Sequence, residues 1–159
     1  VQHQLRNAQG LPLTEEHDIV YRSAAQPGEA APAPQKPPLD GQAVWSRSIT
    51  PDDVLLFRYS ALTFNGHRIH YDRKYVTEVE GYPGLIVHGP LIATLLLDLL
   101  RRSLPGAQVA TFDFRAVRPT FDLHPFSVHG KPSADGKTVE LWAQDHEGWL
   151  TMQGTATLA

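Results

Sequence analysis

The 159-residue chain contains no cysteine, which excludes a thiol nucleophile, a disulfide and any cysteine-ligated metal site. It also lacks an excess of positive charge, because 14 Lys and Arg stand against 17 Asp and Glu. Such a chain has no basic field of the kind that attracts nucleic acid or anionic lipid. The most apolar run, LIATLLLDLL, is far shorter than the roughly 20 residues of a membrane span and contains Asp98. We therefore expect a soluble, cytoplasmic protein without nucleic-acid or membrane partners.

No methionine opens the chain, since its first residue is Val1 and its single methionine is Met152. No charged segment followed by an apolar one, as in a secretory signal, stands at the start either. We therefore expect that sequence upstream of Val1 has been removed or lost. With 42% hydrophobic and 19% charged residues, the remaining length suits one core of ordinary size plus an extra piece.

A change of composition marks the boundary between that extra piece and the globular part. Residues 1–23 hold one clear apolar stretch, Ile19 to Tyr21, which predicts a single strand that cannot bury a face by itself. The next 15 residues, AAQPGEAAPAPQKPP, contain five of the thirteen prolines, as in a semi-rigid linker. We expect a remnant strand over 1–23, a linker over 24–39 and a globular domain over 40–159.

The segment that begins at Thr50 has the composition of a helix start. Thr50 can cap, Pro51 suits the first helical position, and the two aspartates that follow complement the helix dipole. Apolar residues then recur with a period of about 3.6 residues, which predicts an amphipathic helix running to about Leu62. Its apolar face consists of Val54, Phe57, Ala61 and Phe64, with Leu55 and Leu62 alongside.

A second helix is predicted within YPGLIVHGPLIATLLLDLLRRSLPG. His88 or Gly89 can cap it, Pro90 suits its first position, and Pro105-Gly106 stops it. Between residues 91 and 100 only Thr94 and Asp98 are polar, and a helix that is apolar nearly all round belongs inside a structure. Other elements must therefore wrap around this helix.

The rest of the chain predicts strands. Four segments, 109–120, 125–132, 137–146 and 149–159, alternate or carry β-branched and aromatic residues. Asp135-Gly136 and Glu147-Gly148 between them are typical hairpin turns. One buried helix followed by an antiparallel meander of four strands predicts an α+β domain in which a curved sheet wraps a helix, which is the hotdog arrangement.

A cluster of polar residues follows the first predicted helix, in RYSALTFNGHRIHYDRKY. Asn65, His67, His70 and Asp72 fall within eight residues of one another. A histidine titrates near neutral pH and suits proton transfer, whereas an asparagine amide can only hold water or fix a tautomer. Turn formation by His67 and helix capping by Asp72 are the structural alternatives. Arg58, upstream, could bind a substrate carboxylate or form a surface ion pair.

The two motifs RYSALTFN-x-H-x-IHYD and EGYPGL-x-VHGPL resemble those of the MaoC-like (R)-specific hydratases and dehydratases. The closer resemblance is to a subgroup with mesaconyl-CoA hydratases and hydroxyacyl-thioester dehydratases, and it covers residues 40–120 closely. It implies an acyl thioester of coenzyme A or acyl carrier protein as substrate and no separate cofactor. Since EEHDIVYR resembles the last strand of a first half, the chain would be the C-terminal half of a double hotdog. A homodimer or pairing with a second hotdog half is the expected assembly.

One position departs from that family pattern. The catalytic aspartate of the motif is Asn65 here, and its Asn-Pro pair is His67-Arg68, so only His70 carries over cleanly. The second acid or base would then be Asp72, His67 or a residue of the missing half. The catalytic candidates are His70, Asn65 and Asp72, and the substrate-binding candidates are Gly89, Leu91, His67, Arg58 and His88.

Hydration of an enoyl thioester requires a stabilised enolate oxygen and controlled proton transfer. Free N–H groups at the start of the second helix can stabilise the oxygen, and since Pro90 has none, Gly89 and Leu91 are the expected donors. His88 either packs beneath the helix start or takes part. Arg115 and Arg118 would point to opposite faces of a regular strand, so at most one need meet a phosphate.

A hydro-lyase acting on acyl thioesters is the leading hypothesis. Thioester hydrolysis on the same fold would need a carboxylate near the helix start, for which Asp72 is the candidate. A thioester-binding or structural half without its own catalysis is the third alternative, because Asn65 replaces the acid. Metal binding by His67, His70 and Asp72 is the fourth, although these residues would supply only part of a ligand shell.

Overall fold

The structure is a computed structural model that describes residues 1–18 and 33–159. The chain divides into two compact units, Val1–Pro32 and Ala33–Ala159. The strand predicted at Ile19 to Tyr21 lies outside the described residues. The second unit begins several residues before the predicted domain start at residue 40. Gln35 shows why, since its carbonyl accepts a hydrogen bond of 2.8 Å from the Leu150 N–H.

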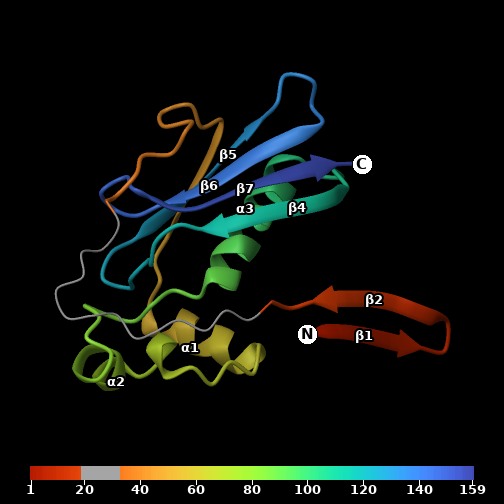
Figure 1. Cartoon of the computed structure of the whole chain (residues 1–159). Coiled ribbons are helices and arrows are strands. Elements are labelled where there is room, and N and C mark those ends of the chain that lie inside the picture. The colour runs from red at the N-terminus through yellow and green to blue at the C-terminus, as the bar shows by residue number, and fades with distance from the viewer. Residues whose placement is uncertain (19–32) are drawn as a thin grey trace. The chain divides into compact units, whose positions relative to one another are not determined.

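The first unit contains a hairpin that the sequence did not predict. Strand β1 (Gln2–Asn7) pairs antiparallel with β2 (Gly10–Glu16), the two red arrows of Figure 1. All six residues of β1 are exposed. Because β1 buries no residue, it carries none of the apolar alternation by which a strand is recognised in a sequence.

The second unit is built on one antiparallel sheet of five strands. Along the sheet the order is β3 (Trp45–Ile49), β5 (Phe126–Pro132), β6 (Thr138–Gln144), β7 (Leu150–Leu158) and β4 (Val109–Ala116). The meander prediction holds for β5, β6 and β7, but β4 pairs with β7 rather than with β5. Strand β3 was missed because its five residues, WSRSI, are too few to show a period before the helix start signal.

The two predicted hairpin turns are confirmed. Gly136 joins β5 to β6 with φ 69° and Gly148 joins β6 to β7 with φ 81°, both in the left-handed region that favours glycine. In each turn an aspartate upstream of the glycine, by one residue in the first turn and by three in the second, accepts backbone N–H bonds. Asp135 accepts from Lys137, and Asp145 accepts from Glu147 and Trp149.

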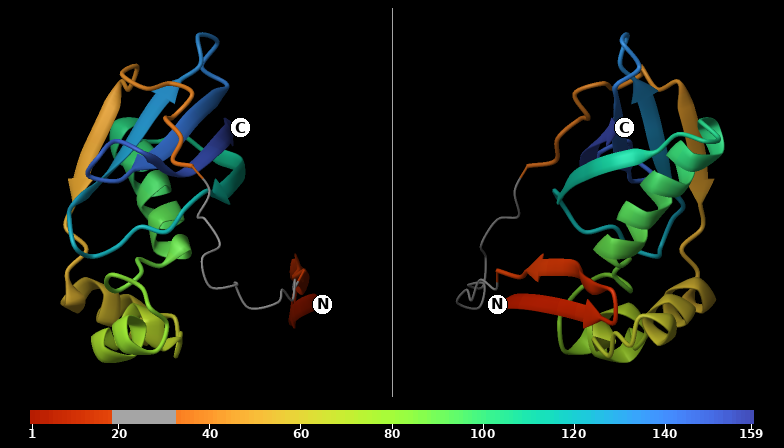
Figure 2. Two further views of the ribbon diagram at one scale, coloured as in Figure 1. Left: turned by 60° about the vertical axis from the view of Figure 1, so that its left-hand side comes forward. Right: turned by 90° about the vertical axis from the view of Figure 1, so that its right-hand side faces the viewer.

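Helix α3 (Gly89–Ser103) packs on one face of this sheet, as Figures 1 and 2 show. His88 is its N-cap residue, so Pro90 takes the second helical position rather than the first. The predicted burial is confirmed for Leu91, Ile92, Ala93, Leu96, Leu99 and Leu100. The two polar residues are not core, since Thr94 is exposed and Asp98 pairs with arginines. The α+β arrangement of a sheet wrapped around a helix is confirmed.

Helix α1 (Asp53–Leu62) is capped by Asp52, whose carboxylate accepts a bond of 2.7 Å from the Leu55 N–H. The predicted capping by Thr50 is therefore wrong by two residues. The helix buries Leu56 and Ser60. The predicted apolar face is exposed instead, with Phe57 at 60% and Phe64 at 96% exposure. Apolar residues lie all around this helix, so the period alone could not identify the side that packs.

The polar stretch after α1 is more ordered than the predicted loop. It contains a turn of 3-10 helix, η1 (Arg68–His70), and a short helix, α2 (Arg73–Glu78). In the views of Figures 1 and 2, α1 and α2 lie together at the N-terminal end of α3. This arrangement places His70, in η1, beside the residue that caps α3.

Candidate active site

His70 is 8% exposed and has a defined orientation. Its Nδ1 lies 2.6 Å from the carbonyl oxygen of Ile86. Because a carbonyl can only accept, Nδ1 carries the proton and Nε2 carries the free lone pair. Burial lowers the pKa of His70, opposed by the bond to Ile86 and assisted by the nearby His67. The ring is therefore neutral at pH 7 and can act as a base through Nε2.

His88 lies against His70, with ring centroids 3.8 Å apart. Its Nε2 is 2.8 Å from the hydroxyl oxygen of Ser60 on α1. Burial, with a contribution from His70, lowers the pKa of His88 to about 4, so this ring is also neutral. At 1% exposure its side chain has no surface for a substrate, and the predicted substrate contact is replaced by a contact with His70.

Asn65 and His67 form a turn beside His70. The Asn65 side-chain oxygen accepts a bond of 3.0 Å from the His67 N–H. The His67 ring is exposed and edge-on to His70, with centroids 5.7 Å apart. Asn65 is half-buried, and its side-chain amide NH₂ makes no hydrogen bond to the described part of the chain. That NH₂ group is therefore available to hold a water or a substrate oxygen.

The Asp72 carboxylate has structural partners. One oxygen accepts from the Tyr75 N–H at 3.0 Å and caps α2, and the other pairs with the Arg68 guanidinium at 2.8 Å. The bond from Tyr75, followed by that from Arg68, lowers the pKa of Asp72. The group is ionised at neutral pH and held by the backbone, so it is poorly suited to donate a proton.

The first turn of α3 supplies backbone N–H groups. Gly89 is its first residue, Pro90 has no N–H, and the Ile92 N–H is already bonded to the His88 carbonyl. Gly89 and Leu91 are thus the residues whose N–H groups have no partner within the helix. The Leu91 side chain is buried, so only its backbone could meet a substrate.

Each of the two histidine rings is hydrogen bonded to a residue that lines a cavity. Ser60, bonded to His88, lines a cavity of ≈ 290 Å³ together with Asn65 and apolar residues of α1. We call it the α1 cavity. Ile86, bonded to His70, lines a cavity of ≈ 320 Å³ that includes Gly89. We call it the α3 cavity. The partner of each ring thus lines a different cavity.

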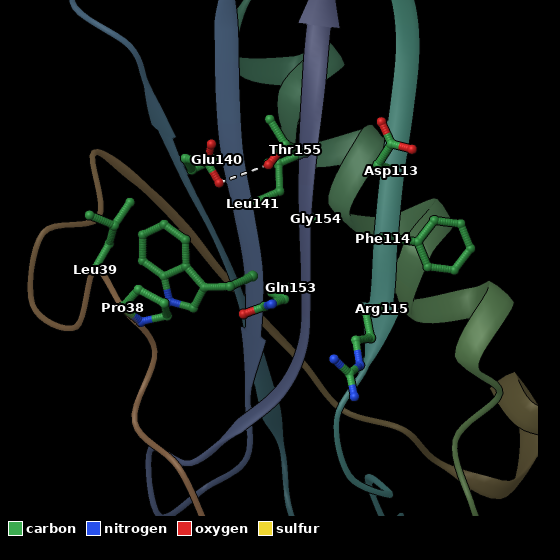
Figure 3. A pocket seen from close by; sticks show the side chains of 11 residues that line it. Pro38, Leu39, Asp113, Phe114, Arg115, Glu140, Leu141, Gln153, Gly154 and Thr155 are labelled. Atoms are coloured by element: carbon green, nitrogen blue, oxygen red, sulfur yellow. Dashed lines mark hydrogen bonds between the residues drawn. The ribbon is translucent and has the colours of Figure 1, made fainter.

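A third cavity, of ≈ 410 Å³, lies elsewhere. Figure 3 shows its lining side chains on strands β4, β6 and β7, with α3 behind the sheet. Pro38 and Leu39 close one side, and Thr155 donates to Glu140 across it at 2.9 Å. Apart from Arg115, a candidate phosphate ligand, none of the predicted site residues lines this cavity.

The sequence did not predict the hydrogen-bond partners of the two histidines, Ser60 and Ile86. Ser60 stood out only as a polar residue within the predicted helix, and Ile86 acts through its backbone carbonyl, which leaves no signal in a side chain. Arg58, a predicted substrate ligand, is exposed on α1 and lines neither the α1 cavity nor the α3 cavity. The role of Arg58 as a substrate ligand stays a prediction.

Within the described ranges 1–18 and 33–159, no three or more His, Asp or Glu side chains are grouped so as to hold a metal ion. His67, His70 and Asp72, although close in sequence, do not form such a group. The helices within these ranges are all too short or too polar to cross a membrane.

Comparison with known proteins agrees with this architecture. The mesaconyl-C(4)-CoA hydratase of Chloroflexus aurantiacus is 44% identical over 161 residues, which cover 99% of this chain and 55% of that protein. An (R)-hydratase from A. caviae superposes with a TM-score of 0.62 at 21% identity, over 71% of this chain and 90% of that one. A MaoC-like dehydratase from Phytophthora capsici has a TM-score of 0.69 at 15% identity, over 99% and 57% respectively.

The chain spans about half the length of the Chloroflexus relative that it matches. The structural likenesses confirm the predicted hotdog fold. The predicted resemblance to mesaconyl-CoA hydratases and hydroxyacyl-thioester dehydratases is confirmed by the sequence comparisons. The sequence profile of the hydroxyacyl-thioester dehydratase type 2 family matches residues 1–122. The chain therefore belongs to the hydroxyacyl-thioester dehydratase type 2 family.

Proposed function

We propose that this chain is the catalytic half of a hydro-lyase that adds water to, or removes it from, the α,β double bond of an acyl thioester. The observation that carries the proposal is the orientation of His70. Its Nδ1 donates to the Ile86 carbonyl, which leaves a basic Nε2 on a buried ring near the first turn of α3. The hydratase activity named for the relative that is 44% identical supports the same class of reaction.

In the hydration direction, the thioester carbonyl oxygen accepts from the N–H groups of Gly89 and Leu91. The positive end of the α3 dipole adds to their field and stabilises the enolate as it forms. Nε2 of His70 removes a proton from water while the water oxygen bonds to the β carbon. The addition is completed when the α carbon receives one proton, either from the protonated His70 or from the group that assists it, which His70 then reprotonates; one water molecule is consumed and His70 returns to its neutral form.

Asn65 orients the attacking water through its NH₂ group, because an amide neither gains nor loses a proton at these pH values. The group that assists His70 is then His67 or a residue of the missing half. Asp72 fits this role less well, since both of its oxygens already have partners. Its catalytic assignment stays a prediction.

The same proposal includes a partner. The sheet ends at β3 and β4, and on β4 the side chains of Val109 and Phe114 are 40% and 51% exposed. An unpaired edge strand with exposed apolar residues is a surface that a second sheet can extend. The occupant that we propose is a second hotdog half, from the same longer protein or from another copy of the chain.

The substrate is a thioester of coenzyme A or of an acyl carrier protein, with no cofactor beyond that carrier group. A cytoplasmic location stays a prediction. Because Asn65 stands where the family motif has an acid, a thioester-binding half without catalysis is the second candidate function. Thioester hydrolysis is less well supported, because the Asp72 carboxylate that it would use caps α2.

The reaction class is tested by following two signals with crotonyl-CoA and mesaconyl-CoA. Hydration removes the absorbance of the enoyl thioester without releasing a thiol, whereas hydrolysis releases free coenzyme A. We expect loss of the enoyl absorbance alone, and retention of that activity in a His124→Ala control, whose histidine is exposed and distant in sequence from the site. Thiol release would favour a thioesterase. An inactive chain that still binds both thioesters would favour the binding half.

A further inference from the structure

Asp122 carries a buried carboxylate that the proposed reaction does not use. It lies between β4 and β5, and its side chain is 3% exposed. One carboxylate oxygen forms an ion pair with the guanidinium of the half-exposed Arg73, and the other, Oδ1, makes no hydrogen bond to the described residues. A charge is rarely buried unless a partner offsets the loss of its hydration. The pairing with Arg73 therefore calls for a structural or functional reason.

Arg73 connects this carboxylate to the segment that contains the base. It is the first residue of α2 and lies three positions after His70. Its guanidinium bonds to Asp122 and also, at 2.6 Å, to Asp53 on α1, whose side chain is 67% exposed. The hydrogen bond to Asp122, opposed by burial and assisted by Asp53, raises the pKa of Arg73. The arginine is thus always a cation, and it joins α2 to the segment of Asp122.

The segment of Asp122 also holds the carbonyl that orients His70. The Asp122 N–H donates to the Leu85 carbonyl at 3.0 Å, and Ile86 forms an antiparallel bridge with the residue before Asp122. Ile86 in turn accepts from Nδ1 of His70 through its carbonyl and donates its own N–H to the Ile69 carbonyl at 3.0 Å. Ile86 is therefore bonded to the turn of His70 and bridged to the segment of Asp122.

These contacts form a closed cycle of four links. His70 bonds to Ile86, and Ile86 lies in the bridge beside Asp122. Asp122 pairs with Arg73, and Arg73 follows His70 in the chain by three residues. The cycle fixes the His70 ring and the carbonyl to which it donates. Because the bond at Nδ1 decides which nitrogen remains basic, the relative placement of these two groups decides the tautomer of the base.

Gly84 fixes the place of the carboxylate more closely. A Cβ atom added to Gly84 would come within 2.6 Å of Oδ1 of Asp122, which is closer than such atoms approach. Gly84 has no positive φ, so its backbone would accept an alanine, and the missing side chain serves this close approach instead. The carboxylate is thus held by Arg73 at one oxygen and by Gly84 beside the other.

From this arrangement we propose that Arg73 and Asp122 are positioning residues for His70. Their ion pair holds η1 and α2 where Nδ1 meets the Ile86 carbonyl and Nε2 stays free. Neither residue lines the α1 cavity or the α3 cavity, so both act through His70. The proposal rests on the proposed hydro-lyase function, whose base it keeps in the working tautomer. Misplacing a catalytic group by about 1 Å can lower the rate about a hundredfold, even when the cause is remote.

The test replaces the whole pair and compares stability with catalysis. Removing one member would leave the buried charge of Asp122 unpaired and destabilise strongly, whereas replacing both by apolar side chains is often neutral. We therefore combine Arg73→Met with Asp122→Leu and expect an unfolding midpoint near that of the wild type. With crotonyl-CoA, kcat should still fall at least about tenfold and KM should stay within about twofold, because the base alone is misplaced.

The tautomer of His70 is a readout that a purely structural role would not change. The eight histidines are labelled with ¹⁵N, and the signals of His70 are identified by their absence from His70→Gln. At neutral pH the wild type should show a protonated Nδ1 and a bare Nε2. The double variant should show a mixture of the two tautomers. This measurement needs no substrate and is independent of the reaction that the chain catalyses.

Two further variants complete the comparison. Asp53→Asn is the matched control, because it removes the exposed bond to the same guanidinium and leaves the bond to Asp122. Its kcat and its His70 tautomer should equal those of the wild type. Gly84→Ala keeps both charges but forces the carboxylate to move. It should lower kcat and mix the tautomers to a smaller extent, and it replaces the double variant if the latter does not fold.

A folded double variant that keeps the protonated Nδ1, or that keeps kcat within about twofold, would overturn the positioning role. A loss of kcat as large in Asp53→Asn would overturn it too, because the exposed bond would then matter as much as the buried one. A chain whose tautomer changes as expected but which hydrates no enoyl thioester would support the positioning of His70 and reject the proposed function.

Discussion

The rings of His70 and His88 are stacked, with centroids 3.8 Å apart and planes inclined by 17°. Two imidazolium cations at that distance would repel each other strongly, and both rings are buried away from water. The His88 ring is fixed by its bond to Ser60, and the His70 ring by its bond to the Ile86 carbonyl. His70 is therefore the one neutral base of the pair, and the neutral His88 ring packs against it.

This relationship predicts a loss of stability in acid. The pKa of His88 is about 4 in the folded state, below its ordinary value of 6.5, so the unfolded chain binds the proton more tightly. The stabilisation is complete above pH 6.5 and is lost as the pH falls toward 4. From this shift the loss is on the order of 3 kcal/mol. Urea midpoints measured between pH 7.5 and 4 should fall steadily.

The lowered pKa values of His70 and His129 add to that fall, so a variant is needed to isolate His88. His88→Gln removes its titration and should give a flatter dependence of unfolding free energy on pH. An identical slope in wild type and His88→Gln would show that His88 does not titrate as described.

The pH dependence of activity follows from His70. Its neutral form is the base, and burial lowers its pKa below 6.5, so the acid limb of kcat/KM for crotonyl-CoA should have its midpoint below pH 6.5. Since His67 contributes to the lowering, His67→Ala should move that midpoint upward. A wild-type midpoint at or above 6.5 would contradict the buried neutral base.

Ser60→Ala tests whether His88 positions His70. The substitution leaves a buried imidazole nitrogen without its partner, so unfolding free energy should fall by about 1–2 kcal/mol. We also expect kcat to fall roughly tenfold with little change in KM, because the support of the base is loosened. Steady-state kinetics with chemical denaturation measures both effects.

The chain offers a matched control for that variant. Ser127 bonds to His129 at 2.8 Å on strand β5, the same distance as Ser60 to His88. Ser127→Ala should lower stability comparably and leave kcat within about twofold, because His129 is not stacked on His70. Equal losses of kcat in both variants would mean that general destabilisation, rather than positioning, explains Ser60→Ala.

The Asp72→Asn variant tests whether the Asp72 carboxylate only caps α2 or also takes part in catalysis. Asparagine caps helices about as well as aspartate, so only the exposed ion pair with Arg68 is lost, and the unfolding midpoint should change little. If the carboxylate is structural, kcat/KM stays within about threefold of the wild type in the enoyl-CoA assay. A loss of a hundredfold with an unchanged unfolding midpoint would instead identify Asp72 as the second acid or base.

The sequence predicted elements whose signals are local. Three elements are recognisable from their own residues and were placed correctly: the nearly all-apolar run of α3, the Asp-Gly turn and the Glu-Gly turn. The packed side of α1 and the partner of β4 depend on residues distant in the chain. Phe57 and Phe64 match a helical period as well as Leu56 does, yet only Leu56 is buried. No local pattern distinguishes them.

The candidate site, too, has one part that the sequence predicted and one part that it did not. His70 stands in a short motif, so the sequence could single it out, whereas the hydrogen-bond partners of the two histidine rings come from two separate segments. Ser60 lies on α1 and Ile86 precedes α3. Ile86 acts through its backbone carbonyl, which no side-chain pattern in the sequence can indicate.

The most direct test of the account compares His70→Gln with the wild type by the initial rate at which crotonyl-CoA loses its enoyl absorbance. Glutamine is similar in size and can keep a bond to the Ile86 carbonyl but cannot accept a proton at neutral pH. We expect kcat to fall at least about a thousandfold with the unfolding midpoint nearly unchanged, given that general base catalysis contributes roughly 10²–10⁴ in rate. A folded His70→Gln variant that retains a tenth or more of the wild-type rate would contradict the assignment of His70 as the base.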